Sequence, residues 1–247
     1  MPRVFVGTSG YNYKHWSDDV FYPKNLPERK WLEHYGKTFN TVELNVTFYR
    51  LPKTETFEGW RMRTEPNFGF AVKGSRYITH VKKFKECEEP VKLFFERAGA
   101  LKEKLEVVLW QLPPNLKLNL EKLEQFCSLL KNLVSSKNAR QSFEFRHQTW
   151  FCQEVYELLK NYNFSLCIAH SSRYPRDEVV TADFVYLRFH GGEVLYGSNY
   201  SDDELDSWAS KAKKWLKSGK DIYAYFNNDA HGYAVKNALT FKNLITI

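Results

Sequence analysis

Short apolar segments recur along the chain, and polar or charged residues follow them. Seven of the eight segments end in polar or charged side chains, and the first ends in a Thr8-Ser9-Gly10 turn. Near-continuous apolar runs of this length are typical of parallel strands that are covered on both faces. The predicted strands are Val4 to Gly7, Thr41 to Asn45, Phe68 to Lys73, Val107 to Leu112, Ser142 to Arg146, Ser165 to His170, Phe184 to His190 and Ile222 to Asn227.

Segments with helical periodicity fill most gaps between these strands, and only the interval 171–183 is too short and too polar to predict a helix. The length of 247 residues matches the roughly 250 that are typical of an eight-fold β/α barrel. We therefore predict an α/β protein with a single TIM-type (β/α)8-like barrel of parallel strands over residues 1–247, and a weak or missing helix between strands six and seven. The predicted helices are Lys30 to Phe39, Thr54 to Thr64, Cys87 to Leu101, Leu120 to Leu133, Gln153 to Tyr162, Asp202 to Lys217 and His231 to Leu244.

The polar strand ends locate a site, because a parallel barrel gathers the C-terminal ends of all its strands at one mouth. Residues two apart on a strand share a face. Three polar pairs therefore point the same way: Glu43 with Asn45, Glu144 with Arg146, and Arg188 with His190. Unpartnered charges buried midway down a barrel would be costly. We expect these pairs to rim an open pocket, where water and a ligand satisfy them.

Composition restricts the class of protein only broadly. Hydrophobic residues make up 43% of the chain, enough for one large core, and the formal charge of +7 favours acidic partners or simple solubility. The four cysteines are widely spaced and form no C-x-x-C pair, which indicates reduced thiols. There is no room for a signal peptide before the first strand and no apolar run long enough to span a bilayer. We expect a cytoplasmic protein with no membrane partner, of an oligomeric state that the sequence does not determine.

Short motifs stand in order along nearly the whole chain. They are Gly7-Thr8-Ser9-Gly10-Tyr11 with Trp16, Phe21-Tyr22-Pro23, Val42-Glu43-Leu44-Asn45 with Thr47-Phe48-Tyr49 and Pro52, Phe70-Ala71-Val72-Lys73 with Thr79-His80, Gln111-Leu112-Pro113-Pro114, Glu144-Phe145-Arg146-His147 with Trp150, Arg188-Phe189-His190-Gly191, and Tyr225-Phe226-Asn227-Asn228-Asp229 before Ala234 and Asn237-Ala238. In these motifs the chain resembles the YecE-like barrel family, catalogued as domain of unknown function number seventy-two. The resemblance implies a TIM-type barrel and carries no established reaction. Two positions depart from the family pattern, Tyr11 where Trp is commoner and His170 where Asp is more usual, and a pocket-facing His170 would alter the ligand charge preference.

The candidate proton-transfer residues are two carboxylates and a histidine. Glu43 and Glu144 come from different strands, and carboxylates in unequal surroundings can hold different protonation states. The alternative is that they form structural ion pairs with the neighbouring cations. His190 is a further candidate for general acid/base work. We therefore predict Glu43, Glu144 and His190 as catalytic residues.

Three cations, Lys73, Arg146 and Arg188, come to the same mouth and predict an anionic ligand, because the planar fork of arginine suits carboxylate and phosphate. If burial beside Arg146 lowered its pKa, Lys73 would instead suit a Schiff base. Aromatic side chains after the strand ends would form a stacking wall or pack over the core. Asp229 would bind hydroxyls or cap the following helix. The predicted binding residues are Ser9, Tyr11, Trp16, Asn45, Tyr49, Lys73, Gln111, Arg146, His147, Trp150, His170, Arg188, Asn227 and Asp229.

No cofactor and no metal ligand is predicted. His147, His170 and His190 with the nearby carboxylates could bind a divalent metal, but no ligand-like spacing organises them and the three cations would repel it. We expect an enzyme that acts on a small anionic metabolite, phosphorylated or carboxylated and sugar-like, by acid/base isomerisation or hydrolysis. Two alternatives stay open: a protein that binds or processes nucleic acid with a basic, aromatic-lined mouth, and a sensor that binds a small molecule without chemistry.

Overall fold

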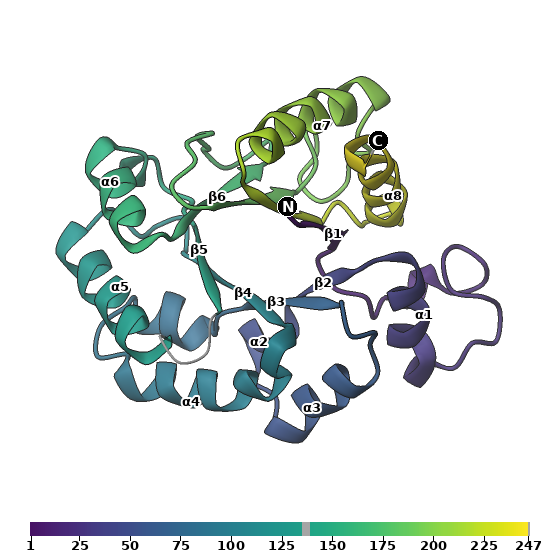
Figure 1. The fold of residues 1–247 in the computed structure, drawn as a ribbon, viewed down its shortest axis with the longest axis horizontal. Coiled ribbons are helices and arrows are strands. Elements are labelled where there is room, and N and C mark those ends of the chain that lie inside the picture. The colour runs from purple at the N-terminus through teal and green to yellow at the C-terminus, as the bar shows by residue number, and fades with distance from the viewer. Residues whose placement is uncertain (135–138, 247) are drawn as a thin grey trace.

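Eight parallel strands form a nearly closed barrel, as the sequence predicts. The computed structural model describes residues 1–134 and 139–246. The strands pair in the order β1-β8-β7-β6-β5-β4-β3-β2 and stand as a ring in the centre of the molecule (Figure 1). They are β1 (Val4–Thr8), β2 (Thr41–Leu44), β3 (Gly69–Lys73), β4 (Leu105–Gln111), β5 (Arg140–Glu144), β6 (Ser165–His170), β7 (Phe184–Phe189) and β8 (Asp221–Phe226).

Helices cover the outside of the ring (Figure 1). They are α1 (Trp31–Thr38), α3 (Thr54–Met62), α4 (Glu88–Ala98), α5 (Leu120–Val134), α6 (Gln153–Tyr162), α7 (Asp202–Lys217) and α8 (Tyr233–Thr246). A further helix of one turn, α2 (Val46–Tyr49), follows the C-terminal end of β2. Residues 171–183, all of them described, form no helix, which confirms the prediction for the connection between β6 and β7. None of the helices in the described part of the chain combines the length and apolar character needed to cross a bilayer.

Side chains alternate between two separate cores. The larger core lies between the strands and the helices and contains residues such as Val6, Leu44 and Phe145. The smaller core fills the barrel itself. It is rich in aromatic rings, with Phe5, Phe184, Tyr186, Tyr223 and Tyr225 all buried. Because successive residues of a strand point to opposite faces, the residues that continue the inner series at the strand ends reach the mouth of the barrel.

Side chains rather than a regular backbone ladder close the seam between β1 and β2, where the structure has one isolated bridge, between Ser9 and Glu43. The Tyr35 hydroxyl accepts a hydrogen bond from the Thr8 amide (2.9 Å) and donates to the Thr41 carbonyl (3.0 Å). The Asn40 side chain donates to the carbonyl oxygen of Val4 (2.7 Å). The strands approach so closely here that a Cβ atom on Gly7 would lie 2.2 Å from the Thr41 carbonyl oxygen. Glycine is therefore required at this position.

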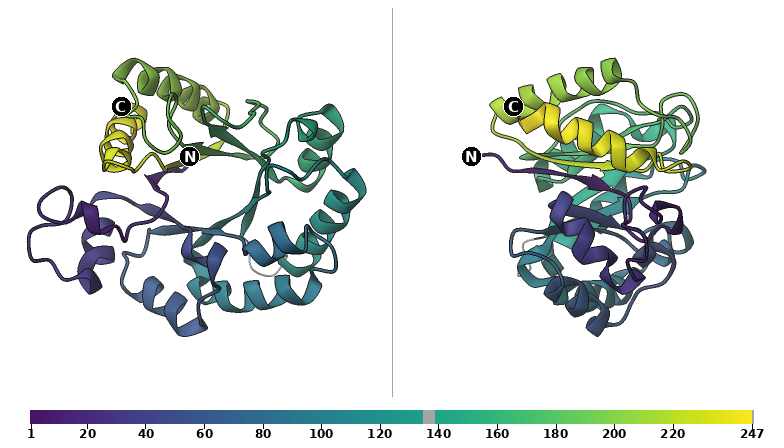
Figure 2. Two further views of the ribbon diagram at one scale, coloured as in Figure 1. Left: turned by 180° about the vertical axis from the view of Figure 1, so that it is seen from behind. Right: turned by 90° about the vertical axis from the view of Figure 1, so that its right-hand side faces the viewer.

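The N-terminal end of the barrel is closed by its own charged cluster. Arg140 pairs with Asp221 (2.7 Å), and Arg3 pairs with Glu106 (2.8 Å). The Tyr223 hydroxyl donates to Glu106 (2.7 Å), which joins this cluster to the aromatic core above it. The right-hand view of Figure 2 shows the N-terminus at this end and β1 running toward the opposite end. The open end of the barrel is therefore the one at the C-terminal ends of the strands.

Candidate functional site at the mouth of the barrel

A buried ion network lies beneath the mouth. The Arg188 guanidinium donates to both oxygens of Glu43, from Nε (2.9 Å) and Nη2 (2.6 Å), and from Nη1 to Glu144 (2.5 Å). The Tyr186 hydroxyl adds a further hydrogen bond to Glu43 (2.8 Å). Glu43, Glu144 and Arg188 are each no more than 1% exposed. The carboxylates therefore lie below the rim that the sequence predicts for them, where cationic partners offset the cost of burial.

Arg146 extends this network toward the mouth. Its Nε donates to Glu144 (2.7 Å), and its guanidinium lies 4.3 Å from the ring centroid of Tyr174. Among the described residues, no acceptor takes a hydrogen bond from its two terminal nitrogens. One edge of the Arg146 fork is thus held in place while the other stays available to a ligand.

Both network carboxylates are ionised. Burial would raise the pKa of Glu43, but the ion pair with Arg188, the hydrogen bond from Tyr186 and the charge of Lys73 together outweigh burial and lower the pKa. The same opposition at Glu144, where Arg146 and Arg188 act together against burial, takes the pKa well below its usual value. Burial, and then the charge of Arg188, lowers the pKa of His190 to about 4. At neutral pH the network therefore holds two carboxylates, two arginines and a neutral imidazole.

A cavity of about 410 Å³ opens above the network. The sequence predicts Asn45, Tyr49, Lys73, Arg146, Arg188, Asn227 and Asp229 as binding residues, and all of them line this cavity. The remaining lining residues, Tyr13, His15, Tyr196 and Ala230, are not among the predicted residues. His15 lies in a one-turn 3-10 helix, Lys14–Trp16, and the other three lie in loops. No hydrophobic period marks any of them, and the one available signal was the position of His15 directly before Trp16.

A histidine and a carboxylate form a pair on one wall of this cavity. His15 Nε2 lies 2.8 Å from Asp229 Oδ2, and the indole nitrogen of Trp16 donates to the same carboxylate (3.0 Å). Burial raises the pKa of Asp229, and the bond from Trp16 opposes it. An imidazole that donates its Nε2 proton to a carboxylate keeps Nδ1 as the atom that takes up or releases a proton. Since the His15 side chain lines the cavity and is 46% exposed, a ligand in the cavity can reach it.

Lys73 is the last residue of β3 and enters the cavity from another wall. Its Nζ lies 4.1 Å from the ring centroid of Phe48. Burial, and then the charge of Arg188, lowers the pKa of Lys73 to about 7. The amine is therefore partly neutral at physiological pH, unlike an exposed lysine.

A second hollow of about 260 Å³ adjoins the cavity and shares Tyr13 and Asn45 with it. Tyr11 and Trp60 supply its aromatic wall, with the Trp60 indole nitrogen donating to the Tyr11 hydroxyl (3.0 Å). Two buried oxygens nearby, Ser9 Oγ and Asn45 Oδ1, have no hydrogen-bond partner within the described residues. Such oxygens at a mouth suit the hydroxyls of a ligand.

Several predicted binding residues lie away from both hollows, each held by a local contact. The Trp150 ring stacks on Phe145 at 4.7 Å on the helix side of the strands, and the Gln111 amide donates to the Leu112 carbonyl (3.3 Å). His147 Nδ1 accepts from the Thr149 amide (3.2 Å) and caps a short turn. His170 Nδ1 lies 2.9 Å from the Tyr200 hydroxyl. The departure from the family pattern at His170 thus leaves the lining of the cavity unchanged.

Within the described residues, no group of three or more His, Cys, Asp and Glu side chains is arranged to hold a metal ion. No such group forms, among these residues, from the three candidate metal ligands of the sequence, His147, His170 and His190. His190 lies under the cavity, where its Nδ1 is 3.1 Å from the Asn227 amide nitrogen, while His147 and His170 have the contacts given above.

The fold and the mouth described above define a TIM-type α/β barrel with a polar cavity at the C-terminal ends of its strands. The chain belongs to the protein family of unknown function DUF72, whose model matches residues 5–247. It is 25% identical to the UPF0759 protein YunF of Bacillus subtilis, over 99% of this chain and 95% of that protein.

Solved structures agree with this assignment. A DUF72 family protein from Thermotoga maritima is 31% identical, with a TM-score of 0.85 over 99% of this chain and 100% of its own. The 3-keto-L-gulonate-6-phosphate decarboxylase of Vibrio cholerae has a TM-score of 0.58 at 7% identity, over 99% of this chain and 98% of its own, and so shares the fold alone.

Proposed function

We propose that this protein is an enzyme that binds a small anionic, sugar-like metabolite in the cavity and moves protons on it, as in isomerisation or hydrolysis. The observation that carries the proposal is one cavity lined by both the half-free fork of Arg146 and the His15–Asp229 pair. A residue that suits anion recognition and a pair that suits proton transfer thus line the same cavity. The volume of about 410 Å³ suits a compound the size of a monosaccharide phosphate.

Arg146 is the main anion-binding residue in this proposal. Its Nε is fixed by Glu144, so the guanidinium is oriented before the ligand arrives and little entropy is lost on binding. Arg188 has a different role, because Glu43 and Glu144 already occupy its fork. Asn45 and Asn227 lie on the same lining and offer amide groups to hydroxyls of the ligand.

His15 is the proton-transfer group that the geometry favours. Asp229 orients the ring and would stabilise its protonated form, as a carboxylate does for a catalytic histidine. Glu43 and Glu144, which the sequence predicts for this work, are ionised and held by arginines, so we assign them to positioning Arg188 and Arg146. His190, neutral and buried beside Asn227, is assigned to the same supporting role.

Calorimetry with matched ligand pairs tests the proposal. We would titrate the protein with ribose 5-phosphate against ribose and with galacturonate against galactose. Arg146 is expected to make the anionic member of at least one pair bind roughly tenfold or more tightly, since a hydrogen bond to a charged group contributes about 1.5–3 kcal/mol. Arg146→Met should abolish that preference, and the exposed Lys214→Met is the matched control.

Turnover is followed by NMR with the anionic ligands that bind. His15→Asn should keep the affinity and lose turnover, because the amide can accept and donate hydrogen bonds but does not transfer protons. Equal affinity for charged and neutral members would contradict the proposal, as would full turnover in His15→Asn.

Salt-dependent binding of a single-stranded oligonucleotide that survives Arg146→Met would support the nucleic-acid alternative. Binding of an anionic ligand without turnover in the parent would support the sensor.

A further inference from the structure

The surroundings of Lys73 separate it from an ordinary anion-binding lysine. Its side chain is 8% exposed and continues the inward-facing series of β3 into the cavity. The Thr47 hydroxyl donates to the Lys73 carbonyl oxygen (2.6 Å), which fixes the end of the strand. The Phe48 ring covers the amine at 4.1 Å. The amine is therefore held in one place, with its accessible side toward the cavity.

Burial, and then the charge of Arg188, disfavours the ammonium form of Lys73. The two carboxylates of the network already accept from arginines, Glu43 from Arg188 and Glu144 from Arg188 and Arg146. Within the described residues, Lys73 forms no salt bridge of its own. Burial and the two guanidinium groups outweigh the opposing charges of Glu144 and Glu43, and the pKa of Lys73 falls to about 7. A desolvated amine beside fixed cations is an activated nucleophile.

We propose that Lys73 forms an imine with a small aldehyde or ketone that carries a phosphate or carboxylate group. This inference rests on the proposed function and names its substrate class. The anionic group would be held by Arg146, which lines the same cavity. The carbonyl carbon would lie against the Lys73 amine, and the hydroxyls against the amides of Asn45 and Asn227.

Formation of the imine can be written as balanced steps that use groups lining the cavity. The Lys73 lone pair forms an N–C bond as the C=O π bond breaks, and a proton passes from nitrogen to oxygen to give a carbinolamine. The hydroxyl then takes a proton from His15, the C–O bond breaks, and water leaves. The nitrogen lone pair forms the C=N bond of the iminium ion, and solvent returns the proton to His15. No oxidant, reductant or metal is needed in this step.

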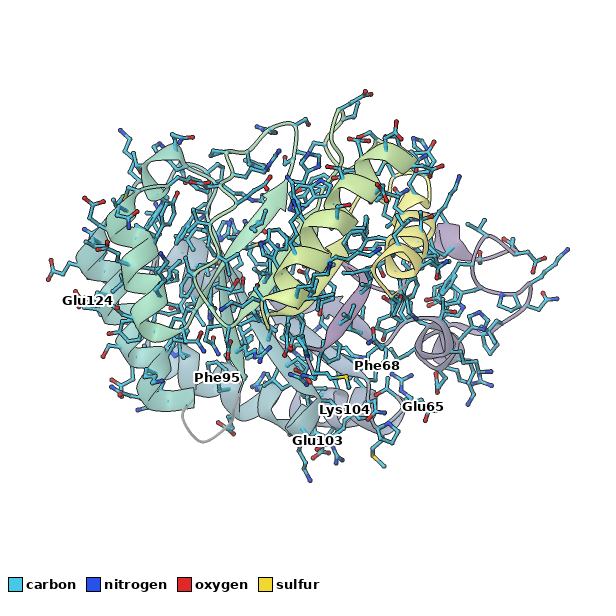
Figure 3. The ribbon with its side chains drawn as sticks, turned by 45° about the horizontal axis from the view of Figure 1, so that its top comes forward. Glu65, Phe68, Phe95, Glu103, Lys104 and Glu124 are labelled. Carbon is cyan, nitrogen blue, oxygen red and sulfur yellow. The ribbon has the colours of Figure 1, made fainter. Side chains whose placement is uncertain are left out.

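Lys104 is a matched control because it is also buried but is fully bonded. It is 5% exposed, and its ammonium donates to the carbonyl oxygens of Arg61 and Thr64 (both 2.7 Å). Figure 3 labels it beside Glu103, and it lines none of the hollows described above. Both lysines are thus buried. Of the two, Lys73 reaches the cavity and has no hydrogen-bond acceptor within the described residues.

The first experiment measures the amine without knowledge of the ligand. The protein is treated at pH 7 with limiting formaldehyde and sodium cyanoborohydride, and labelled lysines are mapped by mass spectrometry. Lys73 should be labelled at least about tenfold faster than Lys104 and than the exposed lysines, because an ordinary lysine with a pKa near 10.4 is almost wholly protonated at this pH. A Lys73 labelled no faster than Lys104 would overturn the proposal.

The second experiment identifies the anionic group. Dihydroxyacetone phosphate, pyruvate and neutral dihydroxyacetone are each added with cyanoborohydride. We expect one adduct on Lys73 from at least one anionic probe, weaker labelling by the neutral probe, and loss of the anionic preference in Arg146→Met. The adduct should disappear in Lys73→Met and in Lys73→Arg, which keeps the charge, and persist in Lys104→Arg.

The two proposals fail in distinguishable ways. Arg146-dependent binding of dihydroxyacetone phosphate or pyruvate in the calorimeter, without any Lys73 adduct, would overturn imine formation and leave anion binding intact. An adduct on Lys73 that is indifferent to Arg146 and to ligand charge would support the nucleophile and contradict the anion site. Neither binding nor an adduct with any probe would overturn both.

Discussion

At the scale of single residues, the unusual feature is a salt-bridge network with almost no exposure to water. The barrel tolerates the buried charges of Glu43, Arg188 and Glu144 because both carboxylates accept hydrogen bonds from a guanidinium group. Desolvation makes such a network a poor source of net stability, yet it makes the loss of one partner severe. The network is therefore better explained as a rigid base for Arg146 and for the cavity than as a stabilising device.

Replacing Arg188 by Met should destabilise the fold by about 3–5 kcal/mol, because two buried carboxylates would lose their main partner. Urea unfolding followed by circular dichroism measures the change. Lys92→Met removes an exposed ion pair with Glu88 and should leave the unfolding midpoint close to that of the parent. A midpoint for Arg188→Met as close to the parent as that of Lys92→Met would show that the network is not held as described.

The alternation of side chains predicts the direction of these residues but not their depth. A period of two places Glu43, Glu144 and Arg188 on the inner face, and the structure agrees. The period does not predict that these three side chains, which are distant in the sequence, lie at one depth and form ion pairs with each other. Their depth depends on the stagger of the strands. His15 lies in a 3-10 helix of one turn, too short to show a period, and only the fold brings it to Asp229.

At the scale of elements, the weakest backbone pairing of the barrel lies between β1 and β2, and α1 compensates for it. The Tyr35 hydroxyl from α1 stands between the strands and bonds to both. The sequence predicts the strands and the helix from their periods, whereas a tyrosine inserted into a strand seam leaves no periodic signal. The short helix α2 also escaped prediction, since four residues are too few for a helical period.

Removing the Tyr35 hydroxyl should open this seam. Tyr35→Phe leaves the buried Thr8 amide and the Thr41 carbonyl without this partner, which should cost about 1–3 kcal/mol. Hydrogen exchange should speed up at the Thr8 amide more than at strand amides on the opposite side of the barrel. Tyr77→Phe, at a half-exposed ring, is the control and should change neither quantity. Unchanged protection of Thr8 would contradict the role given to Tyr35.

At the scale of the whole molecule, the barrel has two charged ends with different tasks. The N-terminal cluster of Arg3, Glu106, Arg140 and Asp221 closes the barrel with pairs that lie partly in water. The C-terminal network lies beneath a cavity and leaves one guanidinium edge and one amine unpaired within the described residues. In barrels of this kind the C-terminal face carries chemistry and the N-terminal face stability, and the charge arrangement here follows that division.

The Lys73 amine should make the unfolding free energy of the protein depend on pH. Because the pKa of Lys73 is about 7 in the folded protein and about 10.4 in an unfolded chain, the unfolded state binds more protons between these values. The unfolding free energy should therefore rise with pH across this window, at up to about 1.4 kcal/mol per pH unit from Lys73. His80 and His190, with pKa values of about 4, act below the window.

Urea unfolding at pH 7, 8 and 9 tests this coupling below the range where tyrosines of the unfolded chain ionise, near pH 10. Subtracting the profile of Lys73→Met from that of the parent removes the contributions of all other groups. The difference should rise with pH, because the folded parent no longer has to bury an ammonium ion once the amine is neutral. The exposed Lys214→Met should run parallel to the parent. Parallel profiles for Lys73→Met would mean that Lys73 titrates as an ordinary lysine, and the imine proposal would lose its nucleophile.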